Sequence, residues 1–337
     1  MPSYQDAVAA TWRLPSSGTE GAERLRALVA AATLAANSHN TQPWHFRIED
    51  RRIAILPDTV RRCPVVDPDD HHLYASLGCA AENLAIAARA LGLAPHIAYD
   101  EAADAVTVDL EPGTAENSPL FAAIPERQST RADYDGKPVP SEDIDRLLAT
   151  AGSDDVDLLL VTEPGRMETI LEYVVAGNTV QMEDAAFMAE LKEWIRFSEG
   201  EAVKAGDGLF AGASGNPTLP RWVASPLFNL FVNAESENDK YSSQIRSSAG
   251  LVLFTANGTG PRYWVEAGRS VQRFALQGTA LGLRNAFLNQ PVEVSTVRQQ
   301  FADYLGLGDR RPDLLVRFGY GPTLPRSLRR PVDQVIV

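Results

Sequence analysis

The sequence predicts an α+β protein made of two fused, related units, each a mostly antiparallel sheet with flanking helices. Two observations favour this fold class. Paired strand-like runs of alternating apolar residues lie on either side of long amphipathic helical stretches. The helical stretch at residues 77–93 also aligns without a gap on residues 267–283, at an offset of 190 (268 − 78).

The first unit is expected to contain two helices and two hairpins. Apolar residues recur at helical spacing within residues 22–36, and the polar residues 37–43 end that helix. The alternating run at 44–58 predicts a hairpin that turns at its charged centre. A long helix beginning at Leu73 and a second hairpin at 96–112 complete the unit.

The repeated helices carry glycine at matched positions, Gly78 and Gly268, and both end in Leu-Gly-Leu. Any two amphipathic helices with this ending would look alike, but similar extended segments follow both, which favours duplication. Matched glycines predict that the two helices cross closely, as at a pseudo-twofold interface. We therefore expect a first unit at residues 1–115 and a second at 116–337, with a lid-like insertion around 205–235.

The composition disfavours several classes of protein. Of the 337 residues, 45% are hydrophobic and 22% are charged, and the formal net charge is −13, which disfavours general binding to nucleic acid or anionic membranes. No segment approaches eighteen consecutive apolar residues, and the N-terminus lacks a secretory pattern. Cys63 and Cys79 make neither a disulfide framework nor a metal spacing. We expect a cytoplasmic protein with small-molecule substrates and no nucleic-acid or membrane partner.

Two arginine clusters stand out against this acidic background. Arg127, Ser129 and Arg131 alternate, so in an extended chain they would project to one side, where guanidinium groups suit a phosphate. The second cluster, near the end of the chain, comprises Arg326, Arg329 and Arg330. The alternative is a solvated loop whose arginines pair with nearby carboxylates.

The loop at residues 37–46, NSHNTQPWHF, carries more polar side chains than a turn requires. Ser38, Asn40 and Gln42 offer neutral donors and acceptors, and Trp44 offers flat apolar surface, which together suit a heteroaromatic ring system. The alternative is a polar turn that caps the preceding helix while Trp44 enters the core.

Other candidate residues give weaker signals. Adjacent His71 and His72 cannot both face one site from a helix, so we expect them to solvate the helix start and expect no metal. Cys79 is interpreted as a small core residue, and residues 212–220 as a mobile segment that acts as a lid. The sequence contains no G-x-S-x-G, no G-x-G-x-x-G after a strand and no H-E-x-x-H, so the motifs of hydrolases and Rossmann folds are missing.

In this order, these segments resemble the nitroreductase family of FMN-dependent oxidoreductases, and more closely its internally duplicated Acg-type branch. The resemblance is carried by SHNTQPWHF at 38–46, RQSTR at 127–131, the paired Leu-Gly-Leu helices and the closing segment at 314–332. It implies a nitroreductase-like fold in which two fused repeats form a pseudo-dimer, with the flavin between them.

The resemblance also implies which residues bind the FMN. The implied set is Ser38, His39, Asn40 and Gln42 at the ring, Arg127, Ser129, Arg131 and Arg329 or Arg330 at the phosphate, and Gln290 to Glu293, including Pro291, near flavin N5. The first half lacks an Arg-x-Ser-x-Arg element and the second lacks a Gln-Pro-Trp loop, so each half retains what the other lost. We expect one FMN per chain, and we name no catalytic residue because the flavin carries the chemistry.

The implied function is NAD(P)H-dependent, two-electron reduction of nitroaromatic, quinone-like or related acceptors by a ping-pong flavin mechanism. The chain would act as a monomer (a pseudo-dimer) or a weak homodimer. Two alternatives stay open. One is a non-catalytic FMN-binding or flavin-sequestering protein in which the 205–235 segment covers the ring, and the other is a duplicated interaction domain without a cofactor.

Overall fold

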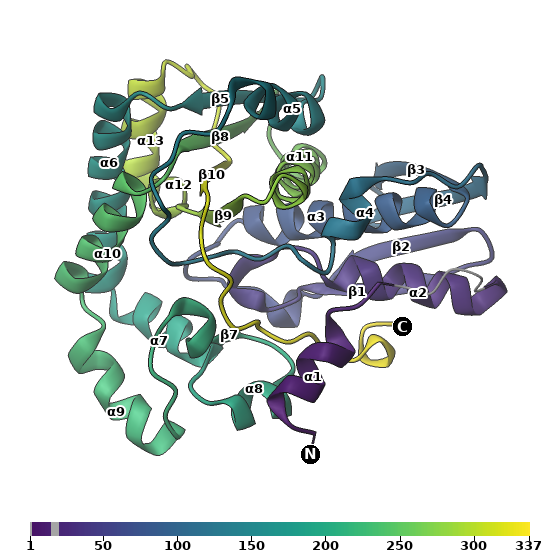
Figure 1. Ribbon diagram of the computed structural model, residues 1–337, viewed down its shortest axis with the longest axis horizontal. Coiled ribbons are helices and arrows are strands. Elements are labelled where there is room, and N and C mark those ends of the chain that lie inside the picture. Colours follow the sequence, from purple (N-terminus) through teal and green to yellow (C-terminus); the bar gives the residue numbers. More distant parts are fainter. Residues whose placement is uncertain (1, 15–19) are drawn as a thin grey trace.

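In the computed structural model, which describes residues 2–14 and 20–337, the eight longer strands form two four-stranded antiparallel sheets (Figure 1). The first sheet contains β1 (Trp44–Ile48), β2 (Arg52–Pro57), β3 (Leu93–Asp100) and β4 (Ala105–Pro112). The second contains β5 (Val156–Val161), β8 (Gly250–Ala256), β9 (Arg284–Phe287) and β10 (Leu314–Gly319). Their orders, β1-β2-β4-β3 and β5-β8-β10-β9, coincide when strands are matched in chain order. The predicted α+β class and both predicted hairpins are confirmed.

The helices around the sheets follow the same plan in both halves. The first half contains α1 (Tyr4–Thr11), α2 (Gly21–Thr33) and α3 (His71–Ala90), and α4 (Pro119–Ala123) and α5 (Ser141–Ala151) lead into the second sheet. The long helix α3 joins β2 to β3, and α11 (Pro261–Ala280) joins β8 to β9. Each long helix stops at its Leu-Gly-Leu, where Gly92 and Gly282 adopt φ values of 76° and 78°, the left-handed conformation that ends helices.

The two long helices cross at their matched glycines. A Cβ atom on Gly268 would lie 1.9 Å from the carbonyl oxygen of Ala75, and one on Gly78 would lie 2.0 Å from that of Val265. The thiol of Cys79 is buried at this crossing and donates to the carbonyl of Gly268 at 3.1 Å. Because α3 packs on the first sheet and α11 on the second, the helix pair joins the two sheets. The predicted close crossing and the core role of Cys79 are confirmed.

The second half differs from the first by a long insertion between β5 and β8, where the first half has only the turn at 49–51. The insertion, on the left and lower left of Figure 1, contains α6 (Pro164–Glu183), α7 (Ala185–Trp194), β6 (Ile195–Arg196), α8 (Glu199–Ala205), β7 (Leu209–Phe210), α9 (Arg221–Phe231) and α10 (Ala234–Arg246). Helices α12 (Gln290–Glu293) and α13 (Ser295–Leu305) then separate β9 from β10. Residues 205–235 lie within this longer insertion. None of the helices in the described ranges is long and apolar enough to cross a membrane.

The C-terminal segment returns from the second sheet to the first (Figure 1). The amide of Phe46 in β1 donates to the carbonyl of Val335 at 2.7 Å, and the amide of Val337 donates back to the carbonyl of Phe46 at 3.0 Å. This return places residues 326–330 beside the loop at 37–43, which belongs to the opposite half of the chain.

Candidate functional site

A cavity of about 960 Å³ lies between the two halves of the chain, a size typical of small-molecule and cofactor sites. The first half contributes the loop that follows α2 and one face of α3, and the second half contributes the insertion and α12. Its lining includes Ser38, His39, His72, Cys79, Arg131, Gln290 and Glu293, together with the apolar side chains Phe187, Phe197, Leu219, Leu227 and Phe228.

The loop at 37–43 has a strained backbone where it borders this cavity. His39, Asn40 and Gln42 have φ values of 47°, 53° and 55°, in the left-handed region that is sparsely populated by residues other than glycine. The side chain of Asn37 accepts a hydrogen bond from the amide of Gln42 at 2.9 Å, which holds the turn. Strain of this kind persists only where surrounding contacts impose it, and it clusters at binding sites.

Two of the predicted ring residues hold this loop in place and do not line the cavity. The Asn40 amide donates to the carbonyls of Gly208 at 2.8 Å and Leu328 at 3.0 Å. The Gln42 amide donates to the carbonyl of Gly206 at 2.9 Å. Both side chains are buried, so they connect the loop of the first half to the insertion and the C-terminal segment of the second.

The aromatic residue of the loop does not face the cavity. Trp44 is fully buried in the hydrophobic core, so the expectation that its ring offers surface to a ligand is wrong, and its alternative placement in the core is confirmed. Ser38 and His39 do line the cavity. Burial lowers the pKa of the His39 ring to about 4, so this imidazole is neutral near pH 7 and offers one donor and one acceptor.

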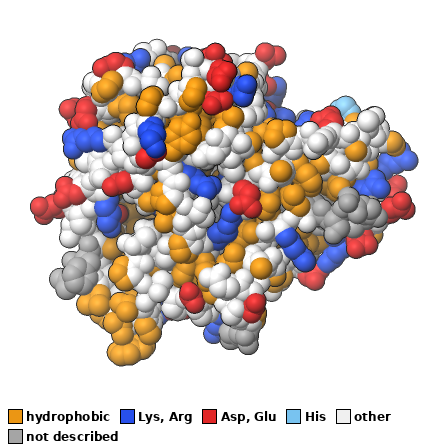
Figure 2. Space-filling view, in the orientation of Figure 1, with side chains coloured by type: hydrophobic (Ala, Val, Ile, Leu, Met, Phe, Trp, Pro, Cys, Tyr) orange, Lys and Arg blue, Asp and Glu red, His pale blue; other side chains and the backbone are white. Residues whose placement is uncertain are grey.

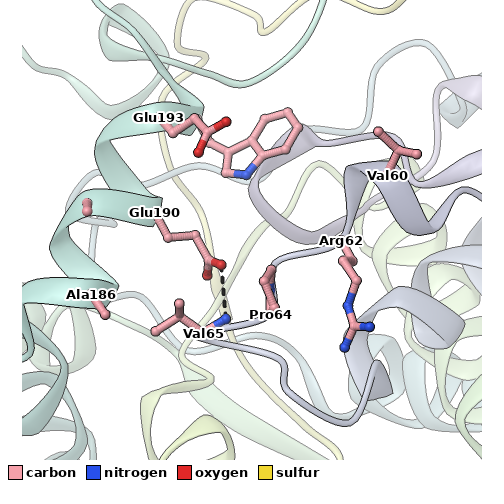
Figure 3. Close-up of a pocket in the computed structure, with 9 residues that line it drawn as sticks. Val60, Arg62, Pro64, Val65, Ala186, Glu190 and Glu193 are labelled. Atoms are coloured by element: carbon pink, nitrogen blue, oxygen red, sulfur yellow. Dashed lines mark hydrogen bonds between the residues drawn. The ribbon is translucent and has the colours of Figure 1, made fainter.

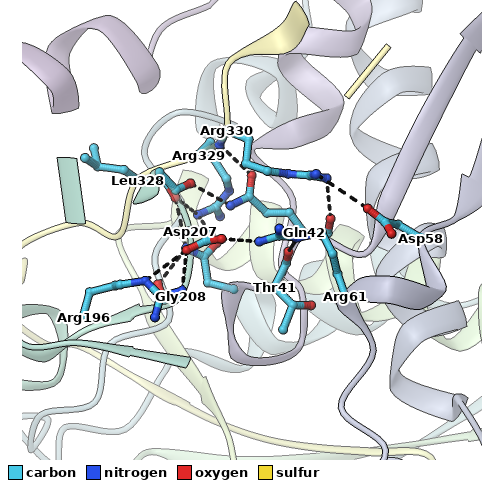
Figure 4. A network of polar contacts seen from close by, with 12 residues as sticks. Thr41, Gln42, Asp58, Arg61, Arg196, Asp207, Gly208, Leu328, Arg329 and Arg330 are labelled. Atoms are coloured by element: carbon cyan, nitrogen blue, oxygen red, sulfur yellow. Dashed lines mark hydrogen bonds and ion pairs between the residues drawn. The ribbon is translucent and has the colours of Figure 1, made fainter. Parts of the chain in front are cut away.

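Asp207 ties the insertion to the same loop (Figure 4). Its carboxylate accepts hydrogen bonds from Arg196 at 2.6 and 3.0 Å, and it also pairs with Arg61. Arg61 in turn donates to the carbonyl of Thr41 in the loop. The carboxylate therefore bridges a guanidinium of the insertion and one of the first half.

Replacing Asp207 with asparagine is expected to loosen this connection, because Arg61 and Arg196 would lose their shared counter-charge while largely buried. We expect a destabilisation of about 1–3 kcal/mol and a selective loss of amide-exchange protection at residues 206–210. The matched control is Asp109→Asn, which breaks the half-exposed pair with Arg52 and is expected to cost below about 1 kcal/mol. Equal amide-exchange profiles for both variants would contradict the role of Asp207 in connecting the insertion to the loop.

Arg127 and Arg329, predicted for a phosphate, meet at the end of α2. Arg127 donates to the carbonyl of Leu34 at 3.1 Å. Arg329 donates to the carbonyls of Thr33 at 2.7 Å and Ala35 at 3.1 Å. The next residue in the chain, Ala36, lines the cavity, so the carbonyls that these two guanidinium groups bind lie one to three residues before the cavity wall.

Neither of these two arginines forms an ion pair with a carboxylate anywhere in the described ranges, and Nε of Arg127 lacks a hydrogen-bond partner there. Burial lowers the pKa of Arg127 to about 10, and burial together with the positive charges of Arg127 and Arg326 lowers the pKa of Arg329 well below its usual range. Buried cations without counter-charges are costly, and an anion bound at this point would offset that cost. The arrangement therefore suits a phosphate.

The other residues predicted for the phosphate have different surroundings. Ser129 forms a backbone β-bridge to β9. Arg131 is exposed, lines the cavity and donates to the hydroxyl of Ser214 at 3.4 Å. Arg330 donates to loop carbonyls and lies 3.6 Å from the carboxylate of Asp58, so it fastens the C-terminal segment to the first half. Of these residues, Arg131 is the one that can reach a ligand in the cavity without rearrangement.

Helix α12 begins on the wall of the cavity at Gln290. The side-chain oxygen of Gln290 is buried without a hydrogen-bond donor within the described ranges, so it can accept from an N–H of a ligand. Pro291 follows in the first turn and is buried. Gly177 of α6 lets α12 approach closely, because a Cβ there would lie 2.7 Å from the carbonyl of Gln290.

The histidine pair at the start of α3 is buried, with exposed fractions of 0% for His71 and 5% for His72. The expectation that these residues solvate the helix start is wrong, because α3 begins inside the protein. The carboxylate of Asp67 caps the helix by accepting from the amides of His72 and Leu73, both at 3.0 Å. Asp67, His71 and His72 lie together, but each already contacts protein partners. Their burial depends on contacts remote in sequence, which no local pattern revealed.

A second, smaller pocket of about 500 Å³ lies between residues 60–65 and α7 (Figure 3). Of its two carboxylates, Glu190 and Glu193, Glu190 accepts from the amides of Val65 at 2.9 Å and Val66 at 3.0 Å. Glu190 thus holds this segment against α7, and we assign no ligand to the pocket.

No protein-family model matches this chain. Two curated proteins of Mycobacterium tuberculosis are similar to it across both halves. "Putative NAD(P)H nitroreductase Rv3131" is 26% identical over 328 residues, which cover 94% of this chain and 91% of that protein. "Putative NAD(P)H nitroreductase acg" is 23% identical over 323 residues, which cover 92% and 94%.

Among solved structures, the FMN-dependent nitroreductase NfnB from Mycobacterium smegmatis, in complex with NADPH, matches 64% of this chain and 96% of its own, at 16% identity and a TM-score of 0.43. A nitroreductase with bound FMN from Desulfitobacterium hafniense matches 66% of this chain and 98% of its own, at 14% identity and a TM-score of 0.40.

Proposed function

We propose that this chain, which is related to the nitroreductase family and to its Acg-type branch, is an FMN-binding oxidoreductase that takes electrons from NAD(P)H. The observation that carries the proposal is a cavity of about 960 Å³ built from both halves, together with two arginines held at the chain segment that leads into it. Arg127 is buried, Arg329 is partly buried, and neither pairs with a carboxylate within the described ranges. The similarity, over nearly the whole chain, to two proteins named NAD(P)H nitroreductases supports the same class.

In this proposal, different residues bind the phosphate and the ring of FMN. Arg127 and Arg329 hold the phosphate by charge-assisted hydrogen bonds. Ser38 and His39 face the ring, and the unpaired oxygen of Gln290 accepts from a ring N–H. Bound FMN supplies the hydride chemistry, while the protein binds it, orients it and excludes water from the cavity.

The site takes different parts from the two units, which we place at residues 1–115 and 116–337. The strained loop comes from the first unit, and Arg127, Arg329 and α12 come from the second. Neither unit supplies both parts, so the chain binds one FMN and needs no second copy to complete the site. A monomer, or a weak homodimer, in the cytoplasm is the form we propose, with no nucleic-acid or membrane partner.

The insertion shapes the space left for an electron acceptor. Phe187, Phe197 and Phe228 bring aromatic surface to the cavity wall, which suits flat apolar acceptors such as quinones and nitroaromatic compounds. NAD(P)H and the acceptor would occupy this space in turn, which gives ping-pong kinetics. The alternative function, flavin sequestration, is favoured by one observation: Leu219 and Leu227 of the insertion also line the cavity and would cover the ring.

A visible spectrum of the purified protein, before and after anaerobic addition of NADH or NADPH, tests the proposal. We expect flavin absorbance corresponding to one FMN per chain, and we expect at least one of the two nucleotides to bleach it. Flavin that neither nucleotide bleaches would establish sequestration. A protein that stays colourless after reconstitution with FMN would refute both functions. Two flavins per chain would refute a single site built from both units.

A further inference from the structure

Buried His72 and largely buried Glu293 form a pair in the wall of the proposed flavin cavity. They come from opposite halves of the chain, His72 from α3 and Glu293 from α12, and both side chains line the cavity. Nε2 of His72 lies 3.4 Å from Oε1 of Glu293 and has no hydrogen-bond partner within the described ranges. Gln181 donates to the other oxygen of Glu293 at 2.6 Å, which fixes the orientation of the carboxylate.

The hydrogen bonds behind this pair fix which nitrogen of each ring carries a proton. His71 Nε2 lies 2.8 Å from a carboxylate oxygen of Asp313, so that nitrogen donates. Burial lowers the pKa of His71 well below its usual range, so the ring is neutral and its Nδ1 is an acceptor. The Nδ1 atoms of the two histidines are 3.2 Å apart, and His72 must therefore donate from Nδ1. The nitrogen of His72 that can gain or lose a proton is Nε2, on the side of Glu293.

The charges around His72 favour its protonated form. Burial by itself lowers the pKa of His72, but Glu293 from α12 and Asp67 from the preceding segment outweigh burial, so the pKa is raised. Arg311 opposes them, and burial keeps the neighbouring rings of His39 and His71 neutral.

We propose that His72, held by Glu293 and His71, is the acid that gives a proton to the electron acceptor in this cavity. The inference rests on the proposed function, because it requires a hydride acceptor beside α12. Both partners of the proton transfer would then meet in one cavity between the halves of the chain.

The proposed step is balanced for a quinone-like acceptor. The acceptor receives a hydride that originates from NAD(P)H, and one of its oxygens gains negative charge. The Nε2–H bond of His72 breaks, an O–H bond forms on the acceptor, and the electron pair stays on Nε2. The product is the hydroquinone, and the neutral ring of His72 recovers a proton from water before the next turnover.

The test measures the two half-reactions separately on flavin-loaded protein. We expect His72→Gln to lower the rate of acceptor reduction by about 10²–10⁴-fold while leaving flavin bleaching by NAD(P)H within about twofold of wild type. We expect Glu293→Gln to move the high-pH loss of acceptor reduction to lower pH, because it removes the charge that favours protonated His72. The control is His96→Gln on β3, where the imidazole is 67% exposed and remote from the cavity.

A second readout does not depend on turnover. The chain has five histidines, so His72 can be assigned in NMR spectra of histidine-labelled wild-type protein. Its imidazole should remain protonated to higher pH than a free histidine imidazole does, and Glu293→Gln should lower the pKa of His72 even if His72→Gln fails to fold. Unchanged pH profiles and titration in Glu293→Gln, or a metal bound stoichiometrically at His72, would overturn the assignment of His72 as the acid and leave the proposed function standing. A wild-type protein without reducible flavin would overturn the proposed function as well.

Discussion

Replacing Gly268 with alanine is expected to destabilise the protein by more than about 4 kcal/mol, or to prevent folding. The added Cβ would lie 1.9 Å from the carbonyl oxygen of Ala75, a backbone atom of α3 that no rotamer change can move. Relief would require α3 and α11 to separate, and this helix pair joins the two sheets. Overpacking usually costs about 1–3 kcal/mol where side chains can adjust, and here they cannot.

Chemical denaturation of Gly268→Ala and wild type measures this cost. The matched control is Gly200→Ala, also within a helix, where an added Cβ meets nothing within 4 Å. That change should be neutral or stabilising by up to about 1 kcal/mol, since alanine favours helix more than glycine does. Gly78→Ala should behave like Gly268→Ala, because the same contact occurs on the opposite helix at 2.0 Å. A Gly268→Ala protein as stable as wild type would mean that the helices cross elsewhere.

This crossing shows which parts of the fold the sequence could predict. Burying one face of a helix or a strand imposes a fixed spacing of apolar residues along the sequence. The spacing in α3 and α11 and the alternation in the hairpins at 44–58 and 96–112 are local patterns of this kind, so these elements could be predicted. Matched glycines carried tertiary information as well, because only a close backbone approach explains glycine within a helix at both positions.

Contacts between distant segments decided what the sequence could not predict. Histidines next to "DPDD" look exposed, but Asp313 and Glu293, more than 200 residues away, surround His71 and His72. Trp44 has the chemistry of a ring-binding residue, and packing in the core decided its role. In both cases the side chain suited two environments, and only the fold selected one of them.

One structural arginine is visible in the sequence by its position within an apolar strand. Arg317 interrupts the apolar strand LLVRFG, and it is fully buried. It donates to the carbonyls of Thr130 at 3.0 Å and Ala132 at 2.8 Å, and its guanidinium lies 4.1 Å from the ring centre of Tyr134. A cation within a buried strand requires hydrogen-bond acceptors, so the position of Arg317 alone indicated that another segment of the chain packs against this strand. That segment carries Arg131.

Replacing Arg127 with glutamine is expected to weaken FMN binding by at least about 100-fold, equivalent to roughly 2.7 kcal/mol. The reason is the loss of charge-assisted hydrogen bonds to the phosphate from a buried guanidinium that has no carboxylate partner within the described ranges. Quenching of flavin fluorescence on titration into apoprotein measures the affinity. The control is Arg146→Gln on α5, where the side chain is 61% exposed and pairs with Asp143 at 3.4 Å.

Two further comparisons separate phosphate binding from general damage to the protein. Riboflavin has the same ring system as FMN without the phosphate, so wild type and Arg127→Gln should bind riboflavin with similar affinity. The apoprotein should also lose little stability, because removing an unpaired buried cation leaves no carboxylate unpaired, unlike breaking a buried ion pair. Equal weakening of riboflavin and FMN would place Arg127 away from the phosphate. A large loss of apoprotein stability would instead make the hydrogen bond to Leu34 its main role.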